Sequence, residues 1–243
     1  MAESVRLRVA TYNIHRGRGL DGRERLDRIA AVLGELKADV VALQEVFQDQ
    51  AWSLAEAIGA SVVFGPTRRL PNGLYGNVCL STLPLVAHAR YNLTCLPFEP
   101  RGCLRADIDV GEAAPLHVLN VHLGLGYRER IRQVRMLSHI FGHARLPGPR
   151  VLLGDFNEWF NGHASRLLRA EFGHARGRRR RLATHPSPMP VFPLDRIYHD
   201  SAIRVVRVGV HRSRLARVAS DHLPTYADLS LGRPGEQANG GRA

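Results

Sequence analysis

The chain has 243 residues, of which 44% are hydrophobic and 23% charged, and this composition excludes a disordered protein. No apolar run approaches the ~20 residues that cross a bilayer, and no apolar secretion signal opens the sequence, so we expect a cytoplasmic protein without a transmembrane segment. The formal net charge of +12 favours an anionic partner, nucleic acid above all and anionic membrane surface as an alternative.

Short β-branched runs alternate with amphipathic stretches, which is typical of an α/β protein. In the first third of the chain, strands are predicted at residues 5–14, 39–46, 61–64 and 77–81, and helices at 26–36 and 52–58. The segment 65–76 (GPTRRLPNGLYG) carries Gly, Pro and Asn, so it is predicted to be a loop at the edge of a site.

The remaining elements continue the alternation. Strands are predicted at 85–93, 104–110, 116–123, 151–153, 204–210 and 225–231, helices at 127–141 and 163–170, and a polar, proline-rich connection at 176–193. Pro and Gly separate several of these strands, as in antiparallel hairpins, which predicts a mixed sheet. Residues 1–231 are expected to form one domain, and 232–243 a disordered tail.

Six polar motifs lie at or just after the ends of apolar runs: TYNIH, LQEV, NVHL, LLGDFN, LDRIY and SDHLP. Side chains at strand ends can converge on one edge of a packed sheet and form a polar site there. Together the motifs supply Asn13, Glu45, His122, Asp155, Asn157, Asp195, Asp221 and His222.

The chemistry of this set indicates metal-assisted attack of water on a phosphate ester. Hard oxygen ligands such as Glu45 and Asp221 suit Mg²⁺ or Mn²⁺. A histidine beside an acid, here His222 with Asp195 or Asp155, can act as a general base or stabilise charge on a phosphoryl oxygen. The two asparagines can donate hydrogen bonds to phosphate without adding negative charge.

The six motifs, in this order, resemble those of the endonuclease/exonuclease/phosphatase superfamily, and the similarity runs from about residue 5 to residue 231. The resemblance implies the DNase I-like fold, a four-layer αββα sandwich of two mixed, mainly antiparallel sheets. The sequence is most similar to small, compact bacterial members with N-I-H and L-D-R-I-Y motifs, a group of unassigned substrate.

The resemblance also implies a role for each matched residue. Glu45 would bind the divalent cation, Mg²⁺ or alternatively Mn²⁺, with Asn13 and Asp221 close to it. Among the remaining motif residues, His122 would contact the scissile phosphate and Asn157 would hold it.

The acid–base residues follow from the same resemblance. Asp155 would orient or deprotonate the attacking water, and His222, oriented by Asp195, would be the second essential group. Either Asp155 or His222 would remove the proton from water, and the sequence leaves both open.

Three further residues are predicted to contact substrate. Asn77 in YGNVCLSTLP and Arg101 in EPRGCLRADI match patterns of the superfamily, and His15 follows the first motif directly. The alternatives are a turn residue for Asn77, a surface arginine for Arg101 and a hydrogen-bonded edge histidine for His15.

The predicted function is therefore a Mg²⁺-dependent phosphodiesterase, a nuclease acting on DNA or RNA. One alternative is a phosphatase or phosphodiesterase acting on phospholipid or small-molecule phosphate esters, although the sequence shows no obvious hydrophobic insertion for membrane binding. The other alternative is an inactive binding module, which would have lost its site residues.

Other features have ordinary structural explanations beside functional ones. The run 176–181 (RGRRRR) could contact nucleic acid or lipid headgroups, but is more typical of a solvated loop. Trp159 and Phe160 could stack on a base or acyl chain, but such a pair is more often part of a core. Cys79, Cys95 and Cys103 lack zinc-ligand spacing and are predicted to be buried thiols.

Overall fold

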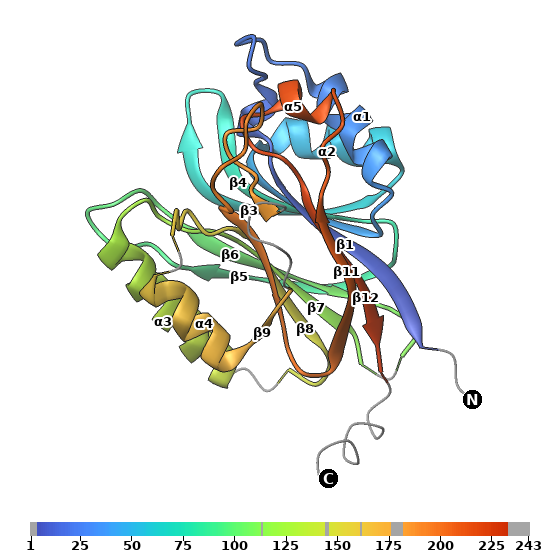
Figure 1. Ribbon diagram of the computed structural model, residues 1–243, viewed down its shortest axis with the longest axis vertical. Helices are drawn as coiled ribbons and strands as arrows, with labels where there is room; N and C mark the ends of the chain where they lie inside the picture. Colours follow the sequence, from blue (N-terminus) through green and yellow to red (C-terminus); the bar gives the residue numbers. More distant parts are fainter. Residues whose placement is uncertain (1–3, 113, 144–145, 161, 176–181, 233–243) are drawn as a thin grey trace.

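Two six-stranded sheets pack face to face in this computed structural model, which describes residues 4–112, 114–143, 146–160, 162–175 and 182–232. The first sheet contains β1 (Val5–Asn13), β2 (Val40–Phe47), β3 (Ser61–Leu70), β4 (Gly73–Ser81), β11 (Ile203–Val210) and β12 (Thr225–Leu231), in the order β11-β12-β1-β2-β4-β3 (Figure 1). The predicted tail lies almost wholly outside the described residues, and so does the arginine run 176–181.

The second sheet is built in the same way. It contains β5 (Leu85–Asn92), β6 (Gly102–Ile108), β7 (Leu116–His122), β8 (Arg150–Asp155), β9 (Gly173–His174) and β10 (Asp195–His199), in the order β5-β6-β7-β8-β10-β9. In each sheet one neighbouring pair is parallel, β1 with β2 and β7 with β8, and the others are antiparallel. The predicted fold of two mixed, mainly antiparallel sheets is confirmed.

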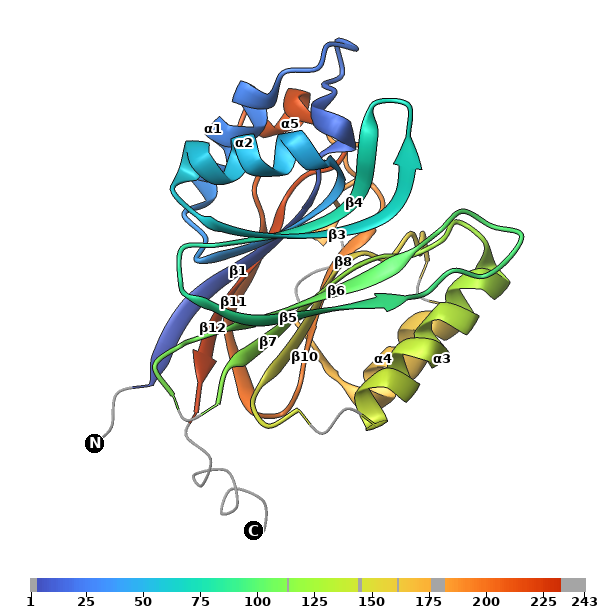
Figure 2. The ribbon, with the colours of Figure 1, turned by 180° about the vertical axis from the view of Figure 1, so that it is seen from behind.

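Helices cover both outer faces, which completes the four layers seen in Figure 2. The first sheet is covered by α1 (Leu26–Leu36), α2 (Gln48–Ile58) and the short α5 (Ala216–Ala219), and the second by α3 (Tyr127–His143) and α4 (His163–Glu171). Within the described residues, no helix combines the length and apolar content needed to cross a membrane.

Three apolar layers hold the sandwich together. Along β1, Val9 points between the sheets while Ala10 and Tyr12 pack against the helices, because successive strand side chains face opposite ways. Cys79, Cys95 and Cys103 are buried and unbridged, as predicted. Burial raises the pKa of the Cys79 thiol to about 12, which keeps it protonated and unreactive.

The segment 65–76, predicted to be a loop, is most of a long hairpin formed by β3 and β4. The prediction was wrong because Gly65 and Pro66 are typical of loops, whereas β3 is an edge strand, where proline removes no needed hydrogen bond. A register shift between Pro66 and Arg68 absorbs the irregularity.

A buried polar network joins the two sheets directly beneath the candidate site. Gln44 on β2 donates to the side chains of Thr11 (3.0 Å) and Asn120 (2.7 Å). Asn120 on β7 donates in turn to the carbonyls of Leu43 and Val78, each at 2.8 Å, in the opposite sheet. Because these groups have no access to water, their pairing sets one relative position for the sheets.

Candidate active site

The six polar motifs converge at one end of the sandwich, away from the start of β1 and the end of β12 (Figure 1). Asn13, Glu45, His122 and Asp155 lie at or near the ends of β1, β2, β7 and β8. Asp195 instead begins β10 and is paired with Asp155, since these strands are antiparallel.

Asp221 and His222 also differ from the prediction that they lie at the end of a strand, because they precede β12. β12 runs antiparallel to β1, with Thr225 opposite Thr11, so its start meets the end of β1. The sequence predicted strand ends for all six motifs because strand direction cannot be read from local pattern.

Asn13 links the carboxylates of both sheets. Its Nδ2 donates to Glu45 Oε1 and to Asp155 Oδ2, both at 3.1 Å, and its Oδ1 accepts the backbone N–H of His15 at 3.0 Å. The side chain is buried, so the three contacts hold it in a single orientation.

Asp155 lies at the centre of the cluster and is almost fully buried. Its Oδ1 accepts the backbone N–H of Asn157 at 2.9 Å. Its Oδ2 lies 3.7 Å from His122 Nε2 and 3.8 Å from His222 Nε2. The carboxylate is thus flanked by two imidazoles and held by two amides.

His222 is held as a cation by the acids around it. Nδ1 of His222 is 2.8 Å from Asp195 Oδ2. Burial disfavours the charged ring, but the carboxylates of Asp195 and Asp155 outweigh it and raise the pKa of His222 to about 10. The imidazolium can therefore donate a hydrogen bond or a proton through Nε2 at neutral pH.

His122, on the other side of Asp155, is neutral. Nη1 of Arg101 lies 3.0 Å from its Nδ1. Because a guanidinium only donates, Nδ1 must accept, and the ring proton resides on Nε2, which faces Asp155. Burial and the Arg101 charge lower the pKa of His122 to about 3.

Strained backbone is concentrated at the site. Among the described residues, five that are not glycine have positive φ, and four of these are His15 (45°), Arg16 (61°), Glu45 (60°) and Asn157 (49°). The fifth, Lys37, follows α1 as its cap, an ordinary place for left-handed backbone. Such strain persists only where surrounding contacts impose it, and it is common at functional sites.

Asn157 and Asn77 differ in how their amides are used. Asn157 Nδ2 donates to the carbonyl of Leu123 at 2.9 Å, beside Asp155. Asn77 is buried between the sheets, and its Nδ2 donates to Gly102 (3.1 Å) and Asn120 (3.4 Å). This amide therefore bridges the sheets, and a contact between Asn77 and substrate stays a prediction.

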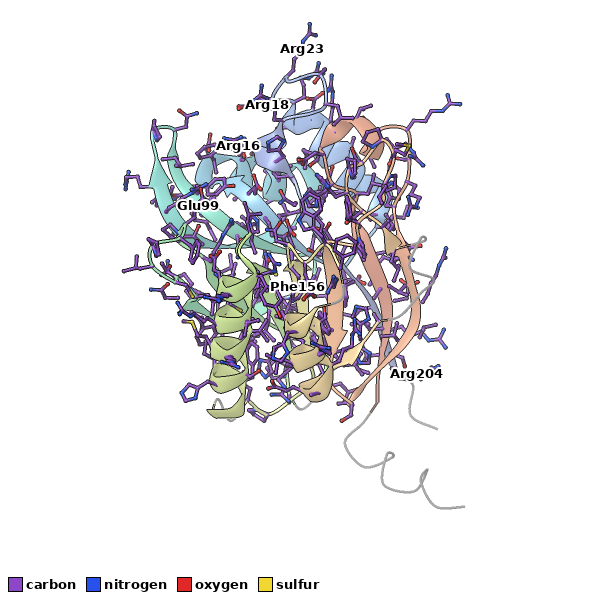
Figure 3. All side chains as sticks on the ribbon, turned by 60° about the vertical axis from the view of Figure 1, so that its left-hand side comes forward. Arg16, Arg18, Arg23, Glu99, Phe156 and Arg204 are labelled. Atoms are coloured by element: carbon purple, nitrogen blue, oxygen red, sulfur yellow. The ribbon has the colours of Figure 1, made fainter. Side chains whose placement is uncertain are left out.

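Tyr75, Arg68 and Glu99 extend the site and were not identified from the sequence. Burial and the Glu45 carboxylate raise the pKa of Tyr75, so its hydroxyl stays protonated beside Glu45. Arg68 lies 5.0 Å from the Tyr75 ring centre and donates to Glu99 at 2.7 Å. Glu99, labelled in Figure 3, also accepts from Arg101 at 3.4 Å. Tyr75 and Arg68 were missed because residues 65–76 were predicted to be a loop.

A buried ion pair supports the loop that follows Asp155. Arg196 donates to the Glu158 side chain at 2.7 Å and to its carbonyl at 2.6 Å, and Ser165 contacts both side chains. Glu158 and Arg196 are the neighbours of Asn157 and Asp195, so this pair connects the two segments that carry them. Arg196 lies within the motif LDRIY and Glu158 directly follows LLGDFN, but their burial as an ion pair could not be inferred from the sequence.

The oxygen ligands predicted for a divalent cation fit that task. In a chain with 34 basic residues, neither Glu45 nor Asp221 has an Arg or Lys ion pair within the described residues. Asp221 has instead His15 Nδ1 at 3.7 Å and His185 Nε2 at 4.0 Å. Partly exposed, unneutralised carboxylates are the ligands that Mg²⁺ prefers.

A second possible ligand group overlaps the first. His185, Asp221 and His222 offer ligand atoms within 4.8 Å of one another. The neighbouring carboxylates raise the pKa of His222, so its ring would have to lose the Nε2 proton before it could bind a metal through that atom. Asp221 is common to both groups, and its neighbour Ser220 donates to the Asn13 carbonyl at 2.8 Å, which places the Asp221 segment at the end of β1.

Trp159 and Phe160 are exposed by 47% and 67%, so the prediction that this pair belongs to the core was wrong. The chain leaves the sheet after Asp155, and only Phe156 turns back into the core beside α3 and α4. The two exposed rings stand next to Phe192, with centroid distances of 4.6 and 6.0 Å.

Comparison with known proteins identifies similar sequences over most of the chain. A model of the "Endonuclease/Exonuclease/phosphatase family" matches residues 10–222. The uncharacterized protein YbhP of Escherichia coli K12 is 29% identical over 247 residues, covering 92% of this chain and 96% of YbhP.

Solved structures share the fold. An endonuclease/exonuclease/phosphatase from Beutenbergia cavernae is 27% identical with a TM-score of 0.77, over 93% of this chain and 72% of that chain. The mannosyl-6-phosphatase Bt3783 of Bacteroides thetaiotaomicron is 19% identical with a TM-score of 0.78, over 92% and 99%. D. rerio TDP2, complexed with single strand DNA product, is 18% identical with a TM-score of 0.73, over 92% and 98%.

Proposed function

The chain belongs to the endonuclease/exonuclease/phosphatase family, and from this premise we propose that it hydrolyses phosphodiester bonds by metal-assisted attack of water. The observation that carries the proposal is the placement of Asp155 between a cationic and a neutral histidine, with Asn13 connecting it to Glu45. A binding module without catalysis would not require two adjacent histidines in opposite charge states.

In the proposed mechanism, Asp155 takes the proton from the attacking water as the new bond from oxygen to phosphorus forms. His222, held by Asp195, gives its proton to the leaving oxygen as the old bond breaks. His122 donates from Nε2 to a phosphoryl oxygen, a contact that its neutral state and tautomer allow.

Glu45 and Asp221 would hold Mg²⁺, or Mn²⁺ in its place, with Asn13 near it. The cation would polarise a phosphoryl oxygen. The Tyr75 hydroxyl, protonated beside Glu45, would keep that carboxylate oriented.

We propose nucleic acid as the first substrate to test, because of the arginines near the site. Figure 3 shows Arg16, Arg18 and Arg23 at the same end of the molecule as Glu99, while Arg204 lies near the opposite end. A phosphodiester backbone would be attracted to such a surface.

A phospholipid or another phosphate ester is the second candidate, and it is favoured by a separate observation. Several large apolar side chains near the site are exposed, and a polyanion alone does not explain them.

The decisive assay is hydrolysis of supercoiled plasmid, an abasic-site duplex and bis(p-nitrophenyl) phosphate with Mg²⁺ or Mn²⁺. Activity is expected to require the metal and to disappear with EDTA and in Asp155→Ala and His222→Ala. His88→Ala, which removes an exposed histidine of β5 outside the site, is the matched control and is expected to retain activity.

The outcomes separate the substrate classes. Cleavage of plasmid or duplex supports the nuclease. Turnover of the small diester without cleavage of nucleic acid supports a lipid or small-molecule substrate. Absence of all metal-dependent turnover would contradict the proposed function.

A further inference from the structure

Four segments at the site end expose large apolar side chains, and we call residues 96–98, 125–127, 159–160 and 189–191 the apolar rim. The five most exposed large apolar side chains in the described part of the chain all lie in it. They are Leu96 (82%), Met189 (74%), Leu125 (70%), Phe160 (67%) and Val191 (57%). Exposure of this kind in neighbouring loops indicates an interaction surface rather than scattered surface residues.

Contacts connect each segment of the rim to the site or to the next segment. Asn157 donates to the Leu123 carbonyl, which places the 125–127 segment just beyond Asp155. The Phe98 ring lies 3.6 Å from where a Cβ on Gly126 would stand, so 96–98 adjoins 125–127.

The other half of the rim reaches the catalytic histidine through a series of rings. Trp159 stands 4.6 Å from Phe192 and 6.5 Å from His185, and His185 stands 4.9 Å from His222. The backbone N–H of Val191 donates to the His185 carbonyl at 2.9 Å, which fixes 189–191 beside these rings.

Elsewhere on the surface formed by the described residues, large apolar side chains are not clustered in this way. Eight of the thirteen exposed large apolar side chains among the described residues belong to the rim, and two more, Leu20 and Val218, lie beside each other next to it. Val218 belongs to α5, whose Arg217 donates to the Pro188 carbonyl at 3.0 Å. Of the exposed large apolar side chains that the structure describes, Trp52, Val86 and Val206 are the ones that lie elsewhere.

Cationic side chains are interspersed with this apolar surface. Arg128 is exposed directly after Tyr127, and Arg18 and Arg23 flank Leu20 and are exposed as well. Apolar side chains that enter the acyl boundary, with arginines at the level of the headgroups, are the combination that binds an anionic bilayer.

We propose that the apolar rim docks this protein on an anionic phospholipid surface, where the second candidate substrate, a lipid phosphodiester, would reach the site. The choice of substrate rests on the proposed hydrolytic function, but the docking does not. A lipid surface fits better than nucleobases because Leu96, Leu125, Met189 and Val191 are aliphatic and offer no ring for a base to stack on.

The test is co-sedimentation of the full-length protein with vesicles of phosphatidylcholine and phosphatidylglycerol, compared with phosphatidylcholine alone. Leu125→Ser and Met189→Ser are each expected to lower the partition coefficient by about tenfold, because each removes an aliphatic anchor. Arg128→Gln is expected to lower it by about fivefold on anionic vesicles only.

Val86→Ser is the matched control, since Val86 is 56% exposed on β5 outside the rim. It is expected to bind vesicles as the wild type does. Circular dichroism of each variant checks folding, which truncation of an exposed side chain should not disturb.

Three outcomes overturn the docking proposal. The first is that the wild type does not bind vesicles, and the second is that Val86→Ser lowers the partition coefficient as much as Leu125→Ser does. The third is that the protein binds single-stranded oligonucleotide but not vesicles, and that Leu125→Ser abolishes this binding. Hydrolysis of bis(p-nitrophenyl) phosphate by the wild type is measured separately. Vesicle binding without hydrolysis supports docking and contradicts the proposed function. Hydrolysis without vesicle binding supports the proposed function and contradicts docking.

Discussion

At the scale of single residues, His122 and His222 show how neighbours decide the chemistry of one side-chain type. Both rings are buried and both approach Asp155 Oδ2. The second nitrogen of His222 faces a carboxylate, whereas that of His122 faces a guanidinium. Opposite partners give opposite pKa shifts, so one ring can give a proton while the other donates only a hydrogen bond.

The partner of His222 can be tested by removing only its charge. Asp195→Asn is expected to lower kcat on bis(p-nitrophenyl) phosphate by about 10²- to 10⁴-fold, because His222 loses the acid that orients and charges it. KM is expected to change little, since Asp195 does not contact the solvent-facing side of the site. Asp109→Asn, an exposed acid elsewhere, serves as control, and an unchanged kcat in Asp195→Asn would refute the assigned role.

The low pKa of His122 predicts a pH dependence of stability. Its folded pKa of about 3 lies below the ordinary 6.5, so the unfolded chain binds the extra proton between these values. Keeping His122 neutral in the folded protein therefore costs no free energy of unfolding above pH 6.5. The cost grows as the pH falls and reaches about 2 kcal/mol at pH 5.

The measurement is urea unfolding at pH 7.5 and pH 5 for the wild type and for His122→Gln. The variant is expected to lose about 2 kcal/mol less on acidification than the wild type. An identical loss in both proteins would show that His122 is not held neutral.

At the scale of elements, glycine allows β8 to deliver Asp155 to the site. Gly154 has φ of +146°, and a Cβ at this position would stand 1.9 Å from the Val121 carbonyl oxygen of β7. The close approach of the two parallel strands thus depends on the missing side chain.

Gly154→Ala is therefore expected to destabilise the protein by about 3 kcal/mol or more, measured by urea unfolding, and to lower activity because Asp155 shifts. Gly34→Ala in α1 is the matched control, since nothing lies within 4 Å of its added Cβ. There the substitution is expected to stabilise by about 0.5–1 kcal/mol. Similar effects at both positions would contradict the packing argument.

The buried network of Gln44 and Asn120 shows why the two sheets hold one alignment. Apolar contacts in the central layer are not directional, whereas the Asn120 amide must meet two particular carbonyls of the opposite sheet. The site lies directly above this network, and residues from both sheets must meet there within hydrogen-bond distance.

At the scale of the whole molecule, the site lies at one end of the sandwich, outside the three apolar layers. The fold is therefore expected to survive removal of the metal. EDTA should abolish hydrolysis yet leave the circular dichroism spectrum unchanged, while Mg²⁺ at a hundred times its Kd should add about 2.7 kcal/mol to the free energy of unfolding.

Glu45→Gln is expected to lose this Mg²⁺-dependent stabilisation, and Glu56→Gln, an exposed acid of α2, to keep it. Unfolding caused by EDTA alone would show instead that the cation is structural.

Local sequence pattern was enough to predict some elements of the fold but not others. The helix at 26–36 was predicted with the observed bounds, because its apolar stripe and its packing face coincide. The hairpin of β3 and β4 was mistaken for a loop, because an edge strand tolerates Gly and Pro that a central strand would not. Trp159 and Phe160 were assigned to the core, because side-chain type alone does not report burial.

The sequence by itself determined the alternation of strands and helices and the order of the six motifs, because periodicity and residue identity are local properties. The resemblance carried by those motifs then implied the layered fold and the reaction class. Only the tertiary structure decided which residues of the site contact one another and which charges they carry. Three features depend on distances between segments that are far apart in the sequence. Asp195 lies opposite Asp155, His122 and His222 carry different charges, and apolar residues of four separate segments form one rim. Burial and long-range electrostatics arise only when the chain is folded, so no local pattern encodes them.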